Sequence, residues 1–433
     1  MAPAVRARRG AATHLELVPR ASEAITVSVA CRACGDGGPL APILSLGRTP
    51  LANALLTAEQ LAEPEPTYPL DLVFCPACSL VQITETVPPE RLFRDYPYFS
   101  SFSDTMVRSA KELIERLVAE RKLGSGSLVI EIASNDGYLL QHYRDLGVPV
   151  LGIEPAANIA RVAEARGVPT LCDFFGAALA ERLAADGRLA DVLHANNVLA
   201  HVAELGGVVR GIRRVLQPGG LVVVEVPYVR DLIDRREFDT IYHEHLSYFS
   251  LTALDRLFGA HGLVVSDVER LALHGGSLRV FVGHQGSPRS DRVRELLSDE
   301  RAIGLLDSAY YRDFAVRVDA LRAELLTLLR ELKARGKRLA AYGASAKGST
   351  LLNTFGIGAE ILDFVVDRSS VKQGRYTPGT HLPILPPAAL LERRPDYVLL
   401  LTWNFAEEIL AQQAPYRAQG GRFIVPVPEP RVV

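Results

Sequence analysis

The sequence predicts an α/β fold in three parts: a small cysteine-rich amino-terminal domain, a central Rossmann-like domain and a carboxyl-terminal Rossmann-like α/β domain. Three observations support it. Two Cys-x-x-Cys pairs lie within the first 80 residues. Apolar strand-like runs then alternate with amphipathic helical runs from about residue 105 to residue 285, a pattern typical of a mostly parallel sheet covered by helices. A second series of such runs begins at Arg338.

Length and composition bound the class of protein. A chain of 433 residues is too long for one ordinary domain, and its 48% hydrophobic and 23% charged residues are typical of a globular protein. A formal net charge of −2 gives no electrostatic reason to expect nucleic acid or a membrane surface as a partner. No apolar run approaches the roughly 20 residues of a spanning helix. We therefore expect a cytoplasmic protein whose oligomeric state stays open, a monomer being compatible with the sequence.

Four segments follow from these patterns. Residues 1–30 are expected to be a flexible extension, because the arginines there are not followed by the apolar run of a secretory signal. Residues 31–88 form the small cysteine-rich domain. Residues 89–285 form the central domain, and residues 286–433 form the carboxyl-terminal one.

The cysteine-rich segment has too little apolar mass for a core of its own and needs a covalent or metal staple. Its short extended runs include Tyr68–Phe74, and a helix fits only near Leu56–Leu61.

The central segment is predicted to follow a regular order of helices and strands. We expect helices at Met106–Arg121, Tyr138–Leu146, Ala156–Arg166 and Glu204–Leu216, and strands at Ser127–Ile132, Val148–Ile153, Asp191–Asn196 and Leu221–Val226. Beyond them, leucines at helical spacing predict one or two long helices between about residues 286 and 335. Strands at Arg338–Tyr342, Ile361–Asp367 and Tyr397–Thr402 then build the second α/β unit.

The four cysteines of the two pairs predict a structural zinc site. Each pair offers two thiolates on one tight turn, and two such turns complete a tetrahedral four-sulfur site with no position left for water. In the reducing setting expected here, such pairs are more often metal ligands than disulfides. The predicted ligands are Cys31, Cys34, Cys75 and Cys78.

The loop after the first central strand predicts a nucleoside cofactor. Glu131 lies at the strand end, and Ala133, Asn135 and Asp136 lie in a small polar turn before a helix. Only Gly137 is a glycine, so the Gly-x-Gly-x-x-Gly pattern of dinucleotide folds is missing. Such a turn suits a cofactor without a pyrophosphate, and this weighs against a nicotinamide oxidoreductase.

Further strand ends supply the rest of a cofactor site. Glu154 is placed to accept both ribose hydroxyls, Asp173 to accept an adenine amino group, and Phe174 to cover the ring. Asn196 ends the fourth strand at the carboxyl edge, where open α/β sheets bind ligands. Together these positions predict S-adenosylmethionine.

Two polar segments remain. Residues 242–245 put a phenol, a carboxylate and two imidazoles in consecutive positions, as in a proton-transfer centre, a His-x-His metal site or a crowded polar loop. Small residues around Ser345, with Lys347 beside them, lie between a strand and a helix and suit a diphosphate. The Walker spacing is absent, so nucleotide hydrolysis is not expected.

In this order the motifs resemble those of the sugar C-methyltransferases that act on nucleotide-linked keto-deoxysugars. The resemblance runs from Cys31 to near the carboxyl end. It rests on the cysteine quartet and on residues 98–101, 131–137, 196–201, 242–245 and 342–348. It implies a zinc domain, an S-adenosylmethionine domain and a Rossmann-like domain that helps to hold the sugar nucleotide. The implied reaction is methylation at C3 of a thymidine-diphosphate (TDP) 4-keto sugar, in the biosynthesis of a branched deoxysugar of a natural product.

The resemblance also assigns roles. His245 matches the base that removes the C3 proton, and imidazole is suited to that task at neutral pH. Glu244 is expected to orient an imidazole, and Tyr242, His201 and Tyr98 are further catalytic candidates, with the roles interchangeable. His243 is expected to point the other way if the segment is extended. The implied substrate-binding residues are Tyr98, Ser100, Asn197, Tyr342, Ser345 and Lys347.

Two rival functions remain. The first is a zinc-bearing methyltransferase acting on RNA, protein or another small molecule, disfavoured for RNA because the zinc segment is not basic. The second is a non-catalytic zinc scaffold, in which the strand-end acids and the polar run at 242–245 would have no purpose.

Overall fold

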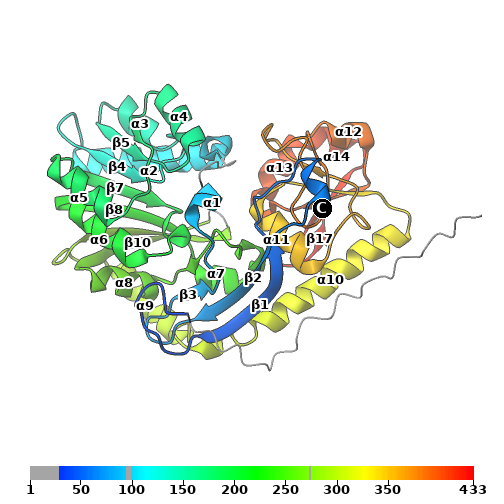
Figure 1. Cartoon of the computed structure of the whole chain (residues 1–433), viewed down its shortest axis with the longest axis horizontal. Helices are drawn as coiled ribbons and strands as arrows, with labels where there is room; N and C mark the ends of the chain where they lie inside the picture. The colour runs from blue at the N-terminus through cyan, green and yellow to red at the C-terminus, as the bar shows by residue number, and fades with distance from the viewer. Residues whose placement is uncertain (1–28, 94–98, 273–274) are drawn as a thin grey trace, which may run out of the picture.

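The computed structural model describes residues 29–93, 99–272 and 275–433. The predicted extension at residues 1–30 therefore lies outside the described residues except for its last two. Figure 1 shows two α/β units side by side, with the amino-terminal strands and the long helix α10 running along one side of both. The predicted α/β class with three parts is confirmed.

The amino-terminal part is a small antiparallel sheet with the strand order β1-β2-β3-β9. Its first three strands are β1 (Ala41–Pro50), β2 (Thr67–Phe74) and β3 (Val81–Ile83). The fourth, β9 (Ser247–Tyr248), comes from the central part of the chain and pairs with β3. Only a short 3-10 turn, Gln60–Ala62, forms near the expected helix. The segment thus borrows a strand, in keeping with its small apolar content.

The central sheet has seven strands in the order β10-β11-β8-β7-β4-β5-β6. Strands β8 to β6 in this order run parallel, and β11 and β10 add an antiparallel edge. The strands are β4 (Val129–Ile132), β5 (Val150–Ile153), β6 (Thr170–Leu171), β7 (Ala190–Asn196), β8 (Leu216–Pro227), β10 (Leu263–Leu271) and β11 (Ser277–His284).

From Asp104 onward, the described residues of this central part form seven helices, and four of them were predicted from the apolar periodicity. The seven are α2 (Asp104–Arg121), α3 (Leu140–Asp145), α4 (Ala157–Ala165), α5 (Ala177–Ala185), α6 (Leu205–Val215), α7 (Val229–Asp234) and α8 (Leu251–Ala260). The four predicted helices (α2, α3, α4 and α6) and four predicted strands of this segment are all present, within a few residues at each end. A third strand was implied before Asp173 without bounds, and it is the two-residue β6. Helices α5, α7 and α8 and the edge hairpin β10–β11 were not predicted.

The carboxyl-terminal part begins with α9 (Asp291–Ala302) and α10 (Phe314–Ala334), the two long helices expected from the leucine spacing. A six-stranded sheet follows in the order β14-β13-β12-β15-β16-β17, parallel except for β17. Its strands are β12 (Leu339–Tyr342), β13 (Val365–Val366), β14 (Ile384–Leu385), β15 (Tyr397–Leu400), β16 (Arg422–Val425) and β17 (Arg431–Val432). Its helices are α11 (Ala346–Phe355), α12 (Ala389–Arg393), α13 (Ala406–Gln412) and α14 (Ala414–Ala418).

One hydrophobic core joins the three parts. It includes buried side chains from β2, from the central strands and from α10, among them Leu72, Val224 and Leu325. The short helix η4 (Phe238–Thr240) links the central part to α11, because the rings of Phe238 and Phe355 stack at a centroid distance of 4.5 Å. The predicted segment boundaries stay predictions, since β9 crosses one of them. In the part of the chain that the structure describes, no helix has the length and apolarity needed to cross a membrane.

Candidate active site

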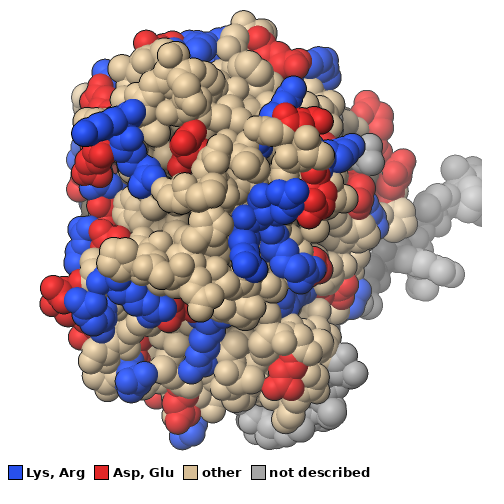
Figure 2. Space-filling model, turned by 90° about the vertical axis from the view of Figure 1, so that its left-hand side faces the viewer, with Lys and Arg blue, Asp and Glu red and all other residues tan. Residues whose placement is uncertain are grey.

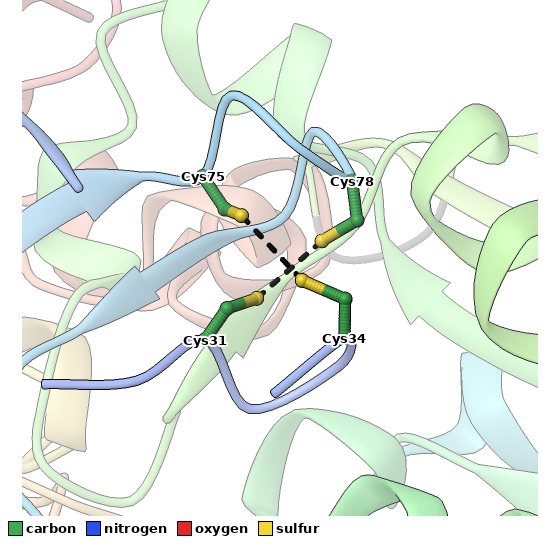
Figure 3. Close-up of side chains that lie close together, drawn as sticks. All are labelled: Cys31, Cys34, Cys75 and Cys78. Carbon is green, nitrogen blue, oxygen red and sulfur yellow. Dashed lines mark hydrogen bonds between the residues drawn. The ribbon is translucent and has the colours of Figure 1, made fainter. Parts of the chain in front are cut away.

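The four predicted zinc ligands come together. Their sulfur atoms all lie within 4.8 Å of one another, with Cys31 Sγ 3.4 Å from Cys78 Sγ and Cys34 Sγ 3.8 Å from Cys75 Sγ (Figure 3). A tetrahedron with Zn–S bonds of about 2.3 Å has sulfur–sulfur edges of about 3.8 Å, so the cluster fits a zinc ion. Both knuckles are tight turns that a positive φ allows, at Gly35 and at Ser79.

Crowding of these thiols gives a second reason to expect a cation. Burial, together with the neighbouring Cys31 thiolate, raises the pKa of Cys75 to about 11. Four thiolates in this space repel one another, and a dication offsets that repulsion. Among the described residues, the quartet is also the only cluster of three or more candidate ligands with metal-site geometry. The His-x-His alternative at residues 242–245 thus has no third ligand.

A single cavity of about 680 Å³ receives side chains from all three parts. Ligand sites of roughly 300–1,000 Å³ are usual, so it has room for small-molecule ligands. The amino-terminal part contributes Asn53 and the central part contributes the ends of β4, β5 and β7. The carboxyl-terminal part contributes the loop before α11 and the segment around Asn404.

Strained backbone marks the cavity wall on the central sheet. Ala133, Asn135 and Asn197 have φ values of 52°, 50° and 57° and line the cavity. A left-handed conformation costs a residue with a Cβ roughly 1–2 kcal/mol, and asparagine tolerates it better than alanine. Such strain tends to persist where the surrounding structure holds the backbone for a purpose. Here it shapes the two loops at the carboxyl ends of β4 and β7.

Glu154 reaches the cavity from the end of β5. Its Oε2 accepts the Asn135 N–H at 2.9 Å and its Oε1 accepts the Ala156 N–H at 2.9 Å. Burial raises the pKa of Glu154, and these two N–H groups partly offset the rise. Each oxygen keeps a lone pair, so the carboxylate can still accept hydroxyl groups of a ligand.

The predicted residues of the β4 loop divide. Asn135 lines the cavity, and its Oδ1 accepts the Ser100 N–H at 2.8 Å. Asp136 lies beneath the surface, where its Oδ2 accepts the Ser101 hydroxyl at 2.5 Å and pairs with Arg166 at 2.9 Å. These side chains therefore attach the segment that starts at Ser100 to the sheet. Tyr98, predicted at that segment, lies outside the described residues.

Glu131 does not reach the cavity wall. It is 1% exposed, and burial, followed by the charges of Glu154 and Asp136, raises its pKa well above the ordinary range. Its Oε2 has no hydrogen-bond partner within the described residues. Sequence placed Glu131 at the strand end, but β4 continues for one more residue, and the alternation of side chains turns Ile132 toward the cavity instead.

The predicted adenine-binding residues also divide. Phe174 lines the cavity together with Phe175, whereas Asp173 is not part of its wall and pairs with Arg182 at 2.7 Å. Asn196 lines the cavity, and its buried Oδ1 has no hydrogen-bond partner among the residues described. An orphaned buried acceptor at a cavity wall is a position where a bound ligand can donate a hydrogen bond.

Residues 242–245 form a turn rather than an extended run, since the His245 N–H donates to the Tyr242 carbonyl at 2.8 Å. The His245 ring bonds at both nitrogens: Nδ1 lies 3.0 Å from the Thr240 carbonyl and Nε2 lies 2.7 Å from the Tyr242 hydroxyl. A carbonyl only accepts, so Nδ1 carries the proton and Nε2 is the unprotonated nitrogen. The phenol therefore donates to Nε2.

The neighbouring side chains point in different directions. Glu244 lines the cavity and accepts from the Asn53 amide at 2.7 Å. His243 Nε2 lies 3.0 Å from the Pro69 carbonyl of β2, so this ring faces the amino-terminal sheet. The expectation that His243 turns away is confirmed, although the turn, and not an extended strand, is the cause.

His201 faces the His245 ring at a centroid distance of 4.8 Å and lines the cavity. Burial lowers its pKa to about 4, so the ring is neutral at pH 7. Its Nδ1 has no hydrogen-bond partner in the described part of the chain. A neutral imidazole in this position can exchange a hydrogen bond with a ligand.

The carboxyl-terminal wall is built around the start of α11. Ser345 caps the helix by accepting the Gly348 N–H at 3.1 Å, and Lys347 follows in the first turn with its Nζ 4.6 Å from the Trp403 ring centre. Both Ser345 and Lys347 line the cavity, but Tyr342 does not: it is buried in the core of the β12 sheet.

Several cavity residues were missed. Asp367 and Lys372 lie across the loop from Ser345. Asp367 accepts the Ala344 N–H at 2.8 Å, and Lys372 donates to the Ala344 carbonyl at 2.8 Å. Asp367 is the last residue of a predicted strand, so the strand-end rule that found Glu154 would have found it. Asn53 carried no such signal, because its partner Glu244 is 191 residues away in sequence.

Three family models match consecutive parts of the chain. They are a "Putative zinc binding domain" over residues 31–93, a "Methyltransferase domain" over residues 102–268 and a "C-methyltransferase C-terminal domain" over residues 272–428.

Two curated relatives agree with these models, one over nearly the whole chain and one over part of it. The C-methyltransferase NovU of Streptomyces niveus is 40% identical over 405 residues, which cover 93% of this chain and 96% of that protein. A ubiquinone biosynthesis O-methyltransferase of a Methylobacterium species is 26% identical over 196 residues, which cover 41% of this chain and 74% of the relative. Among solved structures, magnesium protoporphyrin IX methyltransferase from Synechocystis aligns with a TM-score of 0.32 and 13% identity, over 41% of this chain and 78% of that one. That alignment is too partial to carry an argument.

Proposed function

The chain belongs to the sugar C-methyltransferase family, and from that premise we propose that it methylates C3 of a TDP-linked 4-keto-deoxysugar with S-adenosylmethionine as methyl donor. The product would be a branched deoxysugar of a natural product. One observation carries the proposal: an imidazole with an unprotonated Nε2, a strand-end carboxylate and a lysine at a helix start all line the same cavity.

The reaction needs a base, because carbon becomes a nucleophile here only after losing a proton next to the ketone. In the proposed step the C3–H bond breaks, its electron pair forms the C3=C4 double bond and the C4 oxygen takes the negative charge. The proton passes to His245 Nε2, either directly or through the Tyr242 phenol that bonds to it. Nδ1 keeps its proton on the Thr240 carbonyl, which fixes the ring orientation.

The negative oxygen at C4 needs hydrogen-bond donors. The neutral His201 ring is one candidate, since it lines the cavity beside His245. The Tyr242 hydroxyl is the other, because its single proton can turn from His245 Nε2 to the C4 oxygen once Nε2 has taken the C3 proton. We assign Glu244 a positioning role, because the described contact of its carboxylate is with Asn53. In this role, the hydrogen bond between Glu244 and Asn53 holds the backbone between His243 and His245 in place.

The cofactor would lie at the carboxyl ends of β4, β5 and β7. When bound, S-adenosylmethionine supplies an electrophilic methyl group that the C3 carbanion equivalent can attack. Glu154 would accept the ribose hydroxyls, Phe174 would cover the adenine, and the orphaned Asn196 Oδ1 would accept a donor of the cofactor. Asn135 would shape the loop, because its Oδ1 accepts the Ser100 N–H. Asp136 and Asp173 would act through Arg166 and Arg182, with which they pair. Glu131 is buried away from the cavity wall and receives no role in this proposal.

The diphosphate of the substrate would lie at the start of α11. The first-turn N–H groups of a helix favour an anion, and Lys347 adds a positive charge there. Lys372 lines the same wall and is 12% exposed. Ser100 and Asn197, which also line or border the cavity, would contact the sugar.

The experiment that tests the proposal measures both half-reactions. The protein is incubated with S-adenosylmethionine and a TDP-4-keto-6-deoxysugar, and mass spectrometry follows the methylated sugar and S-adenosylhomocysteine. In D₂O without the methyl donor, NMR follows exchange of the C3 proton. We expect both signals.

S-adenosylhomocysteine formed only with RNA or a protein substrate would replace the proposal with the rival methyltransferase. The face in Figure 2 shows positive and negative side chains interspersed over wide uncharged areas, without the continuous positive field that a nucleic-acid surface needs.

A further inference from the structure

The chain has one tryptophan, and it lies where the central and carboxyl-terminal parts meet. Trp403 begins the short helix η7 (Trp403–Phe405) after β15. Its indole Nε1–H donates to Asp239 Oδ2 at 2.7 Å, across the junction between the two parts. Its ring face supports Lys347, whose Nζ lies 4.6 Å from the ring centre. One side chain thus contacts both a buried carboxylate and the lysine at the cavity wall.

The carboxylate is unusually placed. Asp239 is fully buried in η4, and its Oδ1 has no hydrogen-bond partner among the residues that the structure describes. Burial raises the pKa of Asp239 to about 6, and the charge of Lys347 and the indole N–H oppose that rise. Glu237, two residues earlier, is also buried, and burial raises its pKa to about 8 against the charge of Lys347. Lys347 is therefore the cation that these buried carboxyl groups share.

Two contacts join the segment around Asp239 to α11. Phe238 stacks on Phe355 of α11, and the Thr350 hydroxyl of the same helix donates to the Ile241 carbonyl at 3.1 Å. Between these two contacts lies Thr240, whose carbonyl accepts from His245 Nδ1. Displacement of Trp403 or Asp239 would therefore move Lys347 directly. It would move His245 only indirectly, through Thr240.

We propose that Asp239 and Trp403 are positioning residues that hold Lys347 at the cavity wall and thereby set the affinity for a substrate that carries a diphosphate. The inference rests on the proposed function, because it takes the nucleoside diphosphate as the ligand of that wall. A lysine on a flexible stem loses conformational freedom when it binds an anion. The aromatic face and the buried carboxylate remove part of that loss before the ligand arrives.

The variants separate the two contacts. Trp403→Phe keeps an aromatic face under Lys347 but removes the indole N–H, and Asp239→Asn keeps the shape but removes the charge. Lys347→Met removes the cation and keeps a long side chain at this half-buried position. Lys333→Met is the matched control, since Lys333 lies on α10 in the same part of the chain, pairs with Asp363 and is not part of the cavity wall.

Binding is measured with TDP and with S-adenosylhomocysteine by calorimetry, and the methyl-transfer assay supplies KM for the sugar nucleotide and kcat. We expect TDP affinity to fall roughly tenfold in Trp403→Phe, Asp239→Asn and Lys347→Met, in the range usual for a lost hydrogen bond to a charged group. S-adenosylhomocysteine affinity should hold, and KM should rise more than kcat falls. Trp403 fluorescence gives a second readout: TDP should change it saturably in the wild type and not in Lys347→Met.

Two results would overturn the inference. The first is wild-type TDP affinity in Lys347→Met together with an unchanged fluorescence response; binding at the wild-type level would itself show that this variant is folded. The second is an equal loss of TDP and S-adenosylhomocysteine affinity in Trp403→Phe and Asp239→Asn, which would indicate general damage. If the wild type binds no TDP at all, the proposed substrate class fails as well, so the two failures are distinguishable.

Discussion

At the scale of single residues, the candidate base is defined by its two hydrogen bonds. The Thr240 carbonyl holds the proton on His245 Nδ1, and Nε2 is left as an acceptor that the Tyr242 hydroxyl occupies. A base whose lone pair is already bonded needs either a small movement of the phenol or a relay through it. The two routes give different results when the phenol is removed.

We predict that His245→Asn lowers the rate of C3–H exchange in D₂O by about 10²–10⁴-fold, the usual contribution of a general base. NMR of the keto sugar measures the exchange without any methyl transfer. The matched control is His243→Asn, because this adjacent imidazole faces Pro69 and not the cavity. S-adenosylhomocysteine affinity should be unchanged in both variants. Exchange at the wild-type rate in His245→Asn would remove His245 as the base.

Tyr242→Phe distinguishes the two routes. If the phenol relays the proton, exchange should fall nearly as far as in His245→Asn. If it only covers Nε2, exchange should persist and the acidic side of its pH profile should change, because the imidazole loses a donor that stabilises its neutral form. A variant indistinguishable from the wild type in rate and pH profile would leave Tyr242 without a catalytic role.

The residue scale is also where prediction from sequence reached its limit. The strand-end rule placed Glu154 and Asn196 at the cavity, because each is near the last residue of its strand. It failed to place Glu131 there, because strand ends are uncertain by a residue or two and one step turns a side chain to the other face. Tyr342 differs, because its strand end was predicted correctly; the resemblance assigned it to the substrate, but its side chain packs in the core of its sheet.

At the scale of elements, strand β9 links the metal site to the catalytic turn. It pairs with β3, which follows the second cysteine knuckle, and it begins two residues after His245. The Leu246 N–H also donates to the Ala200 carbonyl at 2.7 Å, next to His201. The turn that carries the candidate base is therefore attached on one side to the zinc domain and on the other to the central sheet.

We expect loss of the metal to disorder the catalytic turn before the cofactor site. Cys75→Ser should lower zinc content, and hydrogen exchange measured by mass spectrometry should increase for peptides spanning residues 242–249. S-adenosylhomocysteine affinity should change less than C3–H exchange, since β4 and β5 belong to the central sheet and not to the sheet that β9 joins. Cys172→Ser, at an exposed cysteine away from the quartet, is the control. Unchanged hydrogen exchange at 242–249 in metal-free protein would contradict the coupling.

This coupling was not predictable from the sequence. Helical periodicity over ten or more residues gives a strong signal, and the long helices α2 and α10 were accordingly predicted. A two-residue strand such as β9 has no periodicity to detect, and its partner β3 lies more than 160 residues earlier in the chain. The cysteine spacing predicted the zinc site, but only the fold shows that β9, next to the catalytic turn, pairs with the sheet of the zinc domain.

At the scale of the whole molecule, a buried histidine and a buried glutamate have opposite effects on the free energy of unfolding as pH changes. His194 in β7 is fully buried, with its Nε2 2.9 Å from the Tyr143 hydroxyl, and burial followed by the charge of Arg279 lowers its pKa to about 3. Glu237 is buried as well, but its pKa is raised to about 8. The imidazole resists gaining a charge in the fold, and the carboxyl group resists gaining one too.

The signs of the two effects are opposite. His194 binds fewer protons folded than unfolded between about pH 6.5 and pH 3, so its contribution to stability is present above that window and is lost as pH falls. Glu237 binds more protons folded than unfolded between about pH 4.3 and pH 8, so its contribution is present at low pH and is lost as pH rises. Wild-type stability alone mixes the two.

Paired variants separate them. We predict that the free energy of unfolding of His194→Gln, relative to wild type, rises by up to about 1.4 kcal/mol for each pH unit lowered from 6.5 toward 4, since glutamine needs no protonation. For Glu237→Gln the same difference should rise as pH increases from 5 toward 8. Urea unfolding at several pH values measures both differences in unfolding free energy. For His194→Gln, the difference at pH 7.5 gives the cost of the lost hydrogen bond to Tyr143 and serves as the reference. If the difference in unfolding free energy between variant and wild type does not change with pH, these groups titrate normally in the fold. The pKa shifts assigned to Glu237 at the junction and to His194 in the central sheet would then be wrong.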